Sequence, residues 1–311
     1  MAKRTNNIVL YTTLINWEPL EVERSQGYAW VKTLAKDDQT GARTLLVKYD
    51  PGFTAEATVS TWPMDIFTLE GEMRCGERTY AKDTYHYRPA GTPIGPIESP
   101  HGITRLIFTA DSQDPAKSSS EEVFVQNVQS DVAPDPPVLR GKRSTPTNEA
   151  SNALLGNAPR AYQYLYDSGH IPADPSSLED NSAQPTLRWR KILRLDPAAQ
   201  IAIRVQRVLK AGVRGAPGEI HVHPWIEEVY LVSGNNQDYC STIDGHWRWI
   251  PGVYVCRISN EGFHGNSLKL DDDYYMIVRS GWTDDPAQAA EWKADQDRTA
   301  RPVPISVSFK E

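Results

Sequence analysis

The feature that most limits the folds open to this chain is an internal repeat. Four short segments recur in the same order in both halves of the sequence. The pairs are WVKTL at 30–34 and WRKIL at 189–193, Pro-Gly turns at 51–52 and 217–218, DIFTLEG at 65–71 and EVYLVSG at 228–234, and YHYR at 85–88 and YVCR at 254–257. This shared order predicts two copies of one domain, and 311 residues are enough for two. The alternative is that unrelated β-sequences share similar turns.

The composition predicts that the repeated domain consists of strands. Twenty glycines and 23 prolines separate short runs of Val, Ile and aromatic residues, a pattern typical of strands joined by turns. The clearest expected strands are residues 43–49, 65–69, 201–209, 229–232 and 274–279. One helix is expected from 287 to about 298, after a cap and first turn at 284–286. The sequence therefore predicts an all-β barrel or sandwich with a short C-terminal helix.

Charge and hydropathy argue against several classes of protein. The net charge of −7, without a long basic run, argues against a nucleic-acid partner. No window approaches about 18 apolar residues, and Thr12 and Thr13 interrupt the N-terminal apolar stretch, so neither a membrane span nor a signal peptide is expected. The three cysteines form no Cys-x-x-Cys pair, which predicts a cytoplasmic protein without a disulfide framework.

Four of the seven histidines lie between positions 221 and 264. His221 and His223 alternate along an expected strand, so both imidazoles can face one metal ion. Glu227 keeps the same parity, although a proline turn before it weakens the argument, and Glu228 is then expected to point outward as a charge. His246 lies in a turn-like segment and is expected to be exposed.

The spacing of these residues resembles the two sequence motifs of the cupin superfamily. His-x-His, three residues, Glu227, six residues and Gly234 resemble the first motif. Pro251 and the residues up to Arg257, followed by His264, resemble the second motif. The details are most similar to the bicupin relatives of the ChrR-type anti-sigma cupin and of the dihydroxyacetophenone-type dioxygenases.

The resemblance is close over residues 218–265 and loose over the rest of both halves. It implies two tandem cupin (jelly-roll) β-barrels, with one divalent metal ion per chain inside the second. The implied metal ligands are His221, His223, Glu227 and His264. Burying such a polar cluster without an ion is costly, which supports a metal site.

The implied domains are an N-terminal cupin without metal ligands at 1–135, a linker or wrapping segment at 136–185, and a C-terminal metal-binding cupin at 186–311. The middle segment is rich in Pro, Ser, Asp and Asn, which is typical of an extended linker. Within it, residues 161–166 are expected to form either an extra strand or a lid.

The first copy lacks the metal ligands of the second. Counted back from Gly71, the counterparts of His221, His223 and Glu227 are Thr58, Ser60 and Met64. The counterpart of His264 is Ile94 if the tyrosine and arginine of YHYR are the anchor, or His101 at a fixed offset from the motif glycine. We favour Ile94, and we expect the first copy to serve as scaffold, dimerisation surface or pocket wall.

Three imidazoles and one carboxylate leave about two of six octahedral positions open on a metal. The resemblance implies Fe(II), which would bind O₂ and a substrate that chelates through adjacent oxygens, as in a dioxygenase that cleaves a carbonyl or aromatic ketone-type compound. Zn, Mn or Ni would instead support an isomerase, lyase or hydrolase. A non-catalytic metal sensor or structural cupin is the third alternative. The expected partners are a small-molecule substrate, O₂ and a second copy in a homodimer, the last implied by the family.

Aromatic residues near the motif are candidates for a substrate pocket. They are Trp225, Tyr230, Trp249, Tyr254 and Phe263. The alternative is that they belong to the core of the barrel. Arg257 is expected either to bind an anionic substrate group or to form a structural ion pair with an aspartate of the linker.

Overall fold

The structure is a computed structural model. It describes residues 8–38, 40–110, 119–128, 162–166, 187–196, 199–209, 225–240, 245–258, 264–270, 274–281, 290 and 292. Among these residues, no helix has the length and apolar character that a membrane crossing requires.

The described residues divide into two compact units. One lies within Leu10–Asp131 and the other is formed mainly within Ala202–Glu311. The expected domain boundaries at 135 and 186 fall outside the described residues, so these boundaries stay a prediction.

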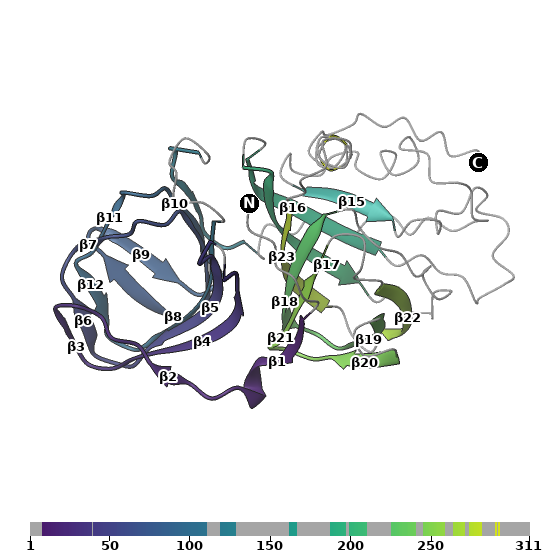
Figure 1. Ribbon diagram of the computed structural model, residues 1–311, viewed down its shortest axis with the longest axis horizontal. Helices are drawn as coiled ribbons and strands as arrows, with labels where there is room; N and C mark the ends of the chain where they lie inside the picture. The colour runs from purple at the N-terminus through teal and green to yellow at the C-terminus, as the bar shows by residue number, and fades with distance from the viewer. Residues whose placement is uncertain are drawn as a thin grey trace, which may run out of the picture. The chain divides into compact units, whose positions relative to one another are not determined.

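The N-terminal unit is a curved antiparallel sheet around an apolar interior (Figure 1). Its elements are η1 (Thr12–Leu14), β2 (Glu18–Pro19), β3 (Ser25–Gln26), β4 (Ala29–Lys36), β5 (Arg43–Tyr49), β6 (Phe53–Ala55), β7 (Thr58–Val59), β8 (Met64–Cys75), β9 (Arg78–Ala81), β10 (Tyr85–Arg88), β11 (Pro93–Ile94), β12 (Ile97–Ser99), β13 (Ile103–Thr109) and β14 (Val123–Val125). Eleven strands form one sheet, in which β8 pairs with β13, β10, β9 and β12. β7 pairs with β11 separately.

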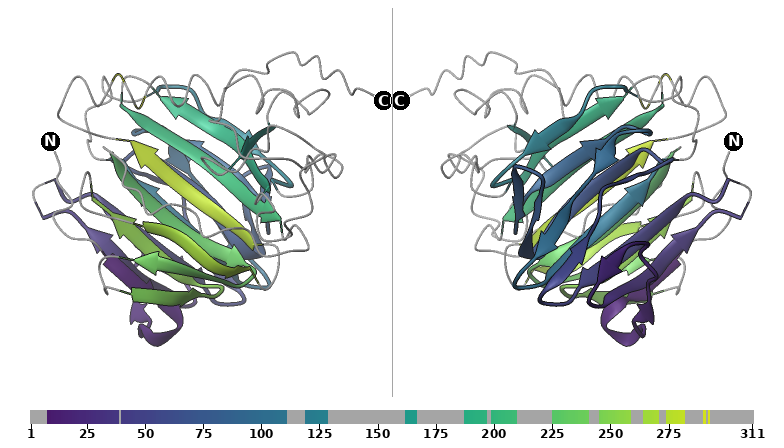
Figure 2. Two further views of the ribbon diagram at one scale, coloured as in Figure 1. Left: turned by 90° about the vertical axis from the view of Figure 1, so that its right-hand side faces the viewer. Right: turned by 90° about the vertical axis from the view of Figure 1, so that its left-hand side faces the viewer.

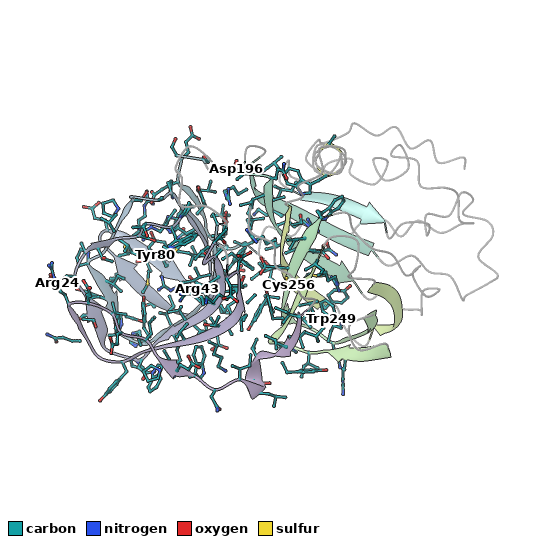
Figure 3. The ribbon with its side chains drawn as sticks, in the orientation of Figure 1. Arg24, Arg43, Tyr80, Asp196, Trp249 and Cys256 are labelled. Atoms are coloured by element: carbon teal, nitrogen blue, oxygen red, sulfur yellow. The ribbon has the colours of Figure 1, made fainter. Side chains whose placement is uncertain are left out.

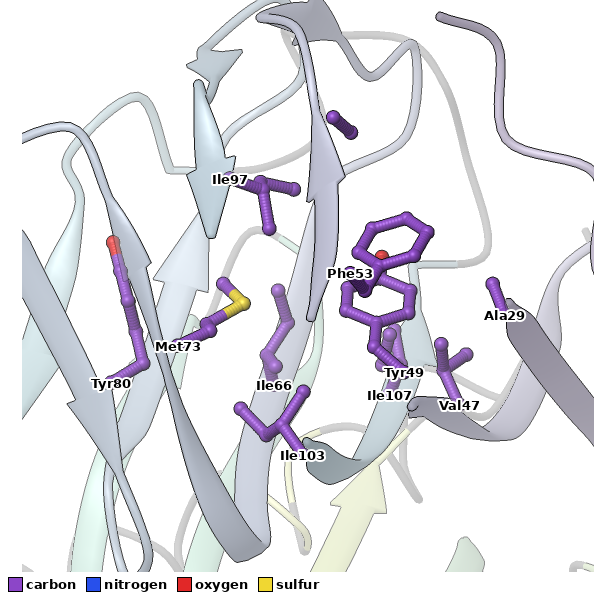
Figure 4. Packing of buried hydrophobic residues seen from close by; sticks show 11 residues of the cluster. Ala29, Val47, Tyr49, Phe53, Ile66, Met73, Tyr80, Ile97, Ile103 and Ile107 are labelled. Carbon is purple, nitrogen blue, oxygen red and sulfur yellow. The ribbon is translucent and has the colours of Figure 1, made fainter. Parts of the chain in front are cut away.

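The core of this unit comes from alternate residues of these strands (Figure 4). Ile66 of β8 and Ile103 and Ile107 of β13 point into it, as alternation along a strand requires. The rings of Tyr49 and Phe53 stack there with their centroids 4.1 Å apart.

The C-terminal unit has two described sheets. Its strands are β1 (Ile8–Tyr11), β15 (Tyr162–Tyr166), β16 (Leu187–Asp196), β17 (Ile201–Leu209), β18 (Ile226–Ser233), β19 (Asn236–Cys240), β20 (Gly245–Trp249), β21 (Val253–Arg257), β22 (His264–Leu270) and β23 (Tyr274–Gly281). Seven of them form a sheet in the order β1-β21-β18-β23-β17-β16-β15, and the other three form a sheet in the order β20-β19-β22. The left view of Figure 2 shows the green and yellow strands of the larger sheet side by side. Its edge strand β1 comes from the N-terminus of the chain.

The strands expected from the sequence are confirmed. Residues 43–49 and 201–209 coincide with β5 and β17, and the other three lie within β8, β18 and β23. The segment at 161–166 contains a strand, β15, which pairs with β16. Of the expected C-terminal helix, only Ala290 and Trp292 are described, and both are helical. Cys75 and Cys256 are free thiols.

The two units use the same register at their centres, which confirms the internal repeat. In β8, Met64 lies opposite Arg88 of β10 and Thr109 of β13. In β18, Glu227 occupies the equivalent position, opposite Arg257 of β21 and Ser280 of β23.

The glycine that ends the repeated segment has the same conformation in both copies. Gly71 has a φ of 74° and Gly234 a φ of 91°, which a side chain disfavours. A Cβ atom on Gly71 would lie 2.1 Å from the carbonyl oxygen of Gly102, so close packing also requires glycine there.

Candidate functional site

The candidate site is centred on Glu227, in the middle of the seven-stranded sheet. Its side chain is only 6% exposed. Its cross-strand neighbour Arg257 places its guanidinium 5.3 Å from the ring centroid of Trp249 (labelled in Figure 3), which belongs to β20 of the smaller sheet. The face that bears Glu227 and Arg257 therefore points toward the smaller sheet, into the interior of the unit.

Two arginines bind the carboxylate of Glu227. Arg204 Nη2 donates to Oε1 at 2.9 Å, and Arg257 Nη1 donates to Oε2 at 2.8 Å. Arg204 also donates from Nη1 to Ser280 Oγ at 2.6 Å. These charge-assisted hydrogen bonds offset the cost of burying the carboxylate and fix its orientation.

Glu228 lies on the opposite face of the same strand, as strand parity predicts. It is fully buried, which corrects the expectation that it is an outward charge. Tyr254 Oη donates to its Oε1, and Arg279 Nη1 donates to its Oε2 at 2.6 Å. The expectation was wrong because β18 lies between β21 and β23 and is buried on both faces. Parity determines the face, but it does not determine exposure.

The other expected metal ligands are placed only in part. His221 and His223 lie outside the described residues, and so does Phe263. The backbone of His264 begins β22, where it pairs with Cys240 of β19. His246, expected in a turn, instead lies in strand β20 opposite Tyr239.

Glu227 fits a metal-ligand position in two respects. It is a buried carboxylate on the inner face, at the cupin spacing from the two histidines. Each of its two oxygens accepts a hydrogen bond from one arginine. The arginines also reduce the net negative charge around Glu227, which weakens its attraction for a cation.

The expected pocket residues are divided between the two faces of the sheet. Trp249 and Arg257 lie on the Glu227 side, and Trp225 packs in an apolar cluster with Ala202 and Trp292. Tyr230 and Tyr254 are cross-strand partners on the Glu228 side, so the structure does not bring these two tyrosines together with Glu227. Arg257 forms an ion pair, but its partner in the structure is Glu227 and not an aspartate of the linker.

Arg204 was not among the site residues predicted from the sequence. It lies in β17 with apolar residues on both sides and is 3% exposed. An arginine inside the apolar run IAIRV was the available signal, because a buried cation needs a charged partner.

The first copy holds different groups at the equivalent positions. Thr58 is exposed on β7, and Ser60 Oγ donates to the Trp62 carbonyl oxygen at 3.0 Å. Met64 packs against the apolar core. In the described part of this unit, these positions supply no histidine or carboxylate.

The strand register supports Ile94 over His101 as the counterpart of His264. Arg74 and Gln237 each lie three residues after the motif glycine, and their partners are Glu98 and Lys269. His264 lies five residues before Lys269, a position that corresponds to Pro93, beside Ile94. His101 lies after Glu98, on the wrong side of the equivalent pair.

Comparison with known proteins identifies the fold. No family model matches the sequence, and no curated protein matches it significantly. A candidate dioxygenase from Nostoc punctiforme has a TM-score of 0.56 and 16% identity, over 89% of this chain and 83% of that chain. Ylba from E. coli has a TM-score of 0.55 and 8% identity, over 92% and 94%. A candidate glyoxylate-induced protein from Pseudomonas aeruginosa has a TM-score of 0.52 and 9% identity, over 91% of each chain. The chain thus has the fold that its motifs predict, two tandem jelly-roll barrels of the cupin type.

Proposed function

We propose that this chain, a bicupin in fold, is a metal-dependent enzyme with one metal site in its C-terminal barrel. The proposed ligands are His221, His223, Glu227 and His264. The observation that supports this best is the position of Glu227, a buried carboxylate on the inner face of β18. Its neighbour Glu228 is equally buried but on the other face.

We propose further that the reaction is a dioxygenation of a chelating carbonyl compound. A bound Fe(II) ion would supply the chelation of adjacent substrate oxygens and the reaction with O₂. The residues of the chain favour an anionic substrate, because Arg204 and Arg257 together carry more positive charge than Glu227 neutralises. The ring of Trp249 covers one side of the Arg257 guanidinium.

A matched pair of variants tests the metal site. Glu227→Gln and Glu228→Gln each remove one buried, ion-paired carboxylate from the same strand. We expect metal content, measured by elemental analysis of folded protein, to fall strongly in Glu227→Gln and to stay near one ion per chain in Glu228→Gln. An equal loss in both variants, or no loss in either, would contradict the proposed ligand set.

An oxygen electrode tests the reaction. Protein reconstituted with Fe(II) is expected to consume O₂ only with a 1,2- or 1,3-dioxygenated carbonyl compound, and a panel of aromatic and aliphatic compounds gives the preference. His264→Ala is expected to abolish this uptake. Turnover that continues unchanged without oxygen would replace the dioxygenase with an isomerase, lyase or hydrolase that uses Zn, Mn or Ni.

A further inference from the structure

The interior of the N-terminal barrel contains two buried arginines. Arg88 of β10 and Arg105 of β13 lie on the two strands that flank β8, and they are 2% and 3% exposed. Arg105 has the parity of the core residues Ile103 and Ile107, and its guanidinium lies 4.8 Å from the ring centroid of Tyr49. Figure 4 shows Ile103, Ile107 and Tyr49 in the interior.

Arg88 points into the same interior. It lies opposite Met64, which packs against the core, and has the parity of His86, whose ring lies 5.1 Å from that of Tyr80. Its Nη2 donates to the carbonyl oxygens of Thr92, at 2.9 Å, and Pro93.

Neither guanidinium has a carboxylate partner in the part of the chain that the structure describes. Glu122 is already engaged by Arg78 at 2.8 Å and by His86 at 3.3 Å. The Nε atoms of Arg88 and Arg105 are buried without a hydrogen-bond partner among the described residues. Burial lowers the pKa of Arg88 and the charge of Arg105 lowers it further, against the opposing effects of Cys75, Tyr80 and Glu122. Burying two such cations in one interior is costly unless an anion offsets their charge.

The second barrel shows which kind of anion fits such a place. At the position equivalent to Met64, Glu227 puts one carboxylate between two buried guanidiniums, with one arginine on each oxygen. Arg88 is the counterpart of Arg257, whereas Arg105 lies on the strand next to β8 and Arg204 lies one strand further. The first barrel has a buried arginine at the position of Arg257 and a second buried arginine on another strand, and Met64 stands in place of the carboxylate.

We propose that the interior of the N-terminal barrel binds the carboxylate of a small organic acid between Arg88 and Arg105. The remainder of the acid contacts the apolar side chains on the same face of β8, Met64 and Ile66. These apolar neighbours favour a short-chain carboxylate over inorganic phosphate.

Met64 provides the sharpest test. Met64→Glu would place a carboxylate where Glu227 stands in the other barrel and would compete with the ligand, whereas Met64→Gln has the same size without the charge. We expect one propionate to bind per full-length chain, by calorimetry in the presence of EDTA, in the wild type and in Met64→Gln. The affinity of Met64→Glu for propionate is expected to fall by at least about tenfold. The neutral isostere propionamide is expected not to bind.

Arg105→Met is the second variant, for the case that Met64→Glu does not fold. Methionine keeps an apolar contact with Tyr49 and removes the guanidinium, so propionate affinity is expected to fall by about tenfold. The proposal is overturned if the wild type does not bind propionate, or if both charge-changing variants that fold bind it as the wild type does. Binding of phosphate without propionate would overturn the carboxylate class. Because metal is absent throughout, these outcomes are independent of the enzyme proposal.

Discussion

The two barrels of this chain share one strand register and differ in the charges placed on it. On the inner face, Glu227 opposite Arg257 in one barrel corresponds to Met64 opposite Arg88 in the other. On the outer face, the tyrosine-carboxylate pair is retained, with Tyr254 and Glu228 in one barrel and Tyr85 and Asp65 in the other. The comparison indicates that the repeat preserves the outer polar contact, whereas the inner face has diverged in chemistry.

The largest expected effect comes from making the second barrel resemble the first. Glu227→Met removes the carboxylate and leaves Arg204 and Arg257 buried without it. We expect the free energy of unfolding to fall by about 3–5 kcal/mol, measured by urea denaturation with tryptophan fluorescence. Glu227→Gln is the size-matched control and is expected to lose a similar amount. A loss below about 1 kcal/mol would show that the arginines do not depend on this carboxylate.

The retained outer pair predicts a smaller, matched effect in the two barrels. Tyr85 Oη donates to Asp65 Oδ1 at 2.6 Å, and Tyr254 donates to Glu228. Because the acceptors are buried charges, Tyr85→Phe and Tyr254→Phe are each expected to cost about 1.5–3 kcal/mol by the same urea measurement. If one substitution is costly and the other neutral, the two pairs are not equivalent.

The last expected effect depends on pH and is specific to the first barrel. Burial, together with the charge of Arg88, lowers the pKa of His86 from its usual 6.5 to about 4. As the pH falls below 6.5, the unfolded chain binds a proton that folded His86 does not bind until about pH 4. The free energy of unfolding therefore decreases with falling pH in this window, by at most about 1.4 kcal/mol per pH unit.

The second barrel supplies the control for this pH dependence, because Val255 occupies the position of His86. His86→Val is expected to flatten the stability profile between pH 6.5 and about 4 relative to the wild type. Urea titrations at several pH values check this. Parallel profiles for the two proteins would show that His86 titrates in the same way in the folded and unfolded chains.

Local patterns in the sequence were enough to predict much of the fold. The bounds of β5 and β17 follow from runs of apolar and β-branched residues. The repeated segments that end at Gly71 and Gly234 lie in equivalent strands. Strand parity also separated the faces of Glu227 and Glu228. These features depend on neighbours in the sequence, and for that reason they can be predicted from it.

The rest depends on what packs against each strand. The burial of Glu228 and its contact with Arg279 required knowledge that β18 is covered on both faces. Arg204 joins Glu227 from a strand two places away in the sheet, and local spacing contains no information about such a neighbour. For the same reason the aromatic residues near the motif were grouped together, although Tyr230 and Tyr254 lie on the other face.

The position of β1 has a consequence for how the protein is made. Ile8–Tyr11 is synthesised long before its hydrogen-bonding neighbour in the larger C-terminal sheet, β21, which is Val253–Arg257. Until β21 has been synthesised, β1 has no partner in this sheet and presents unpaired backbone groups. After that, two strands that are distant in the sequence can pair in one sheet. A proteolytic cut between the barrels would therefore leave the C-terminal fragment with the edge of β21 uncovered, open to pairing with the same edge of another molecule.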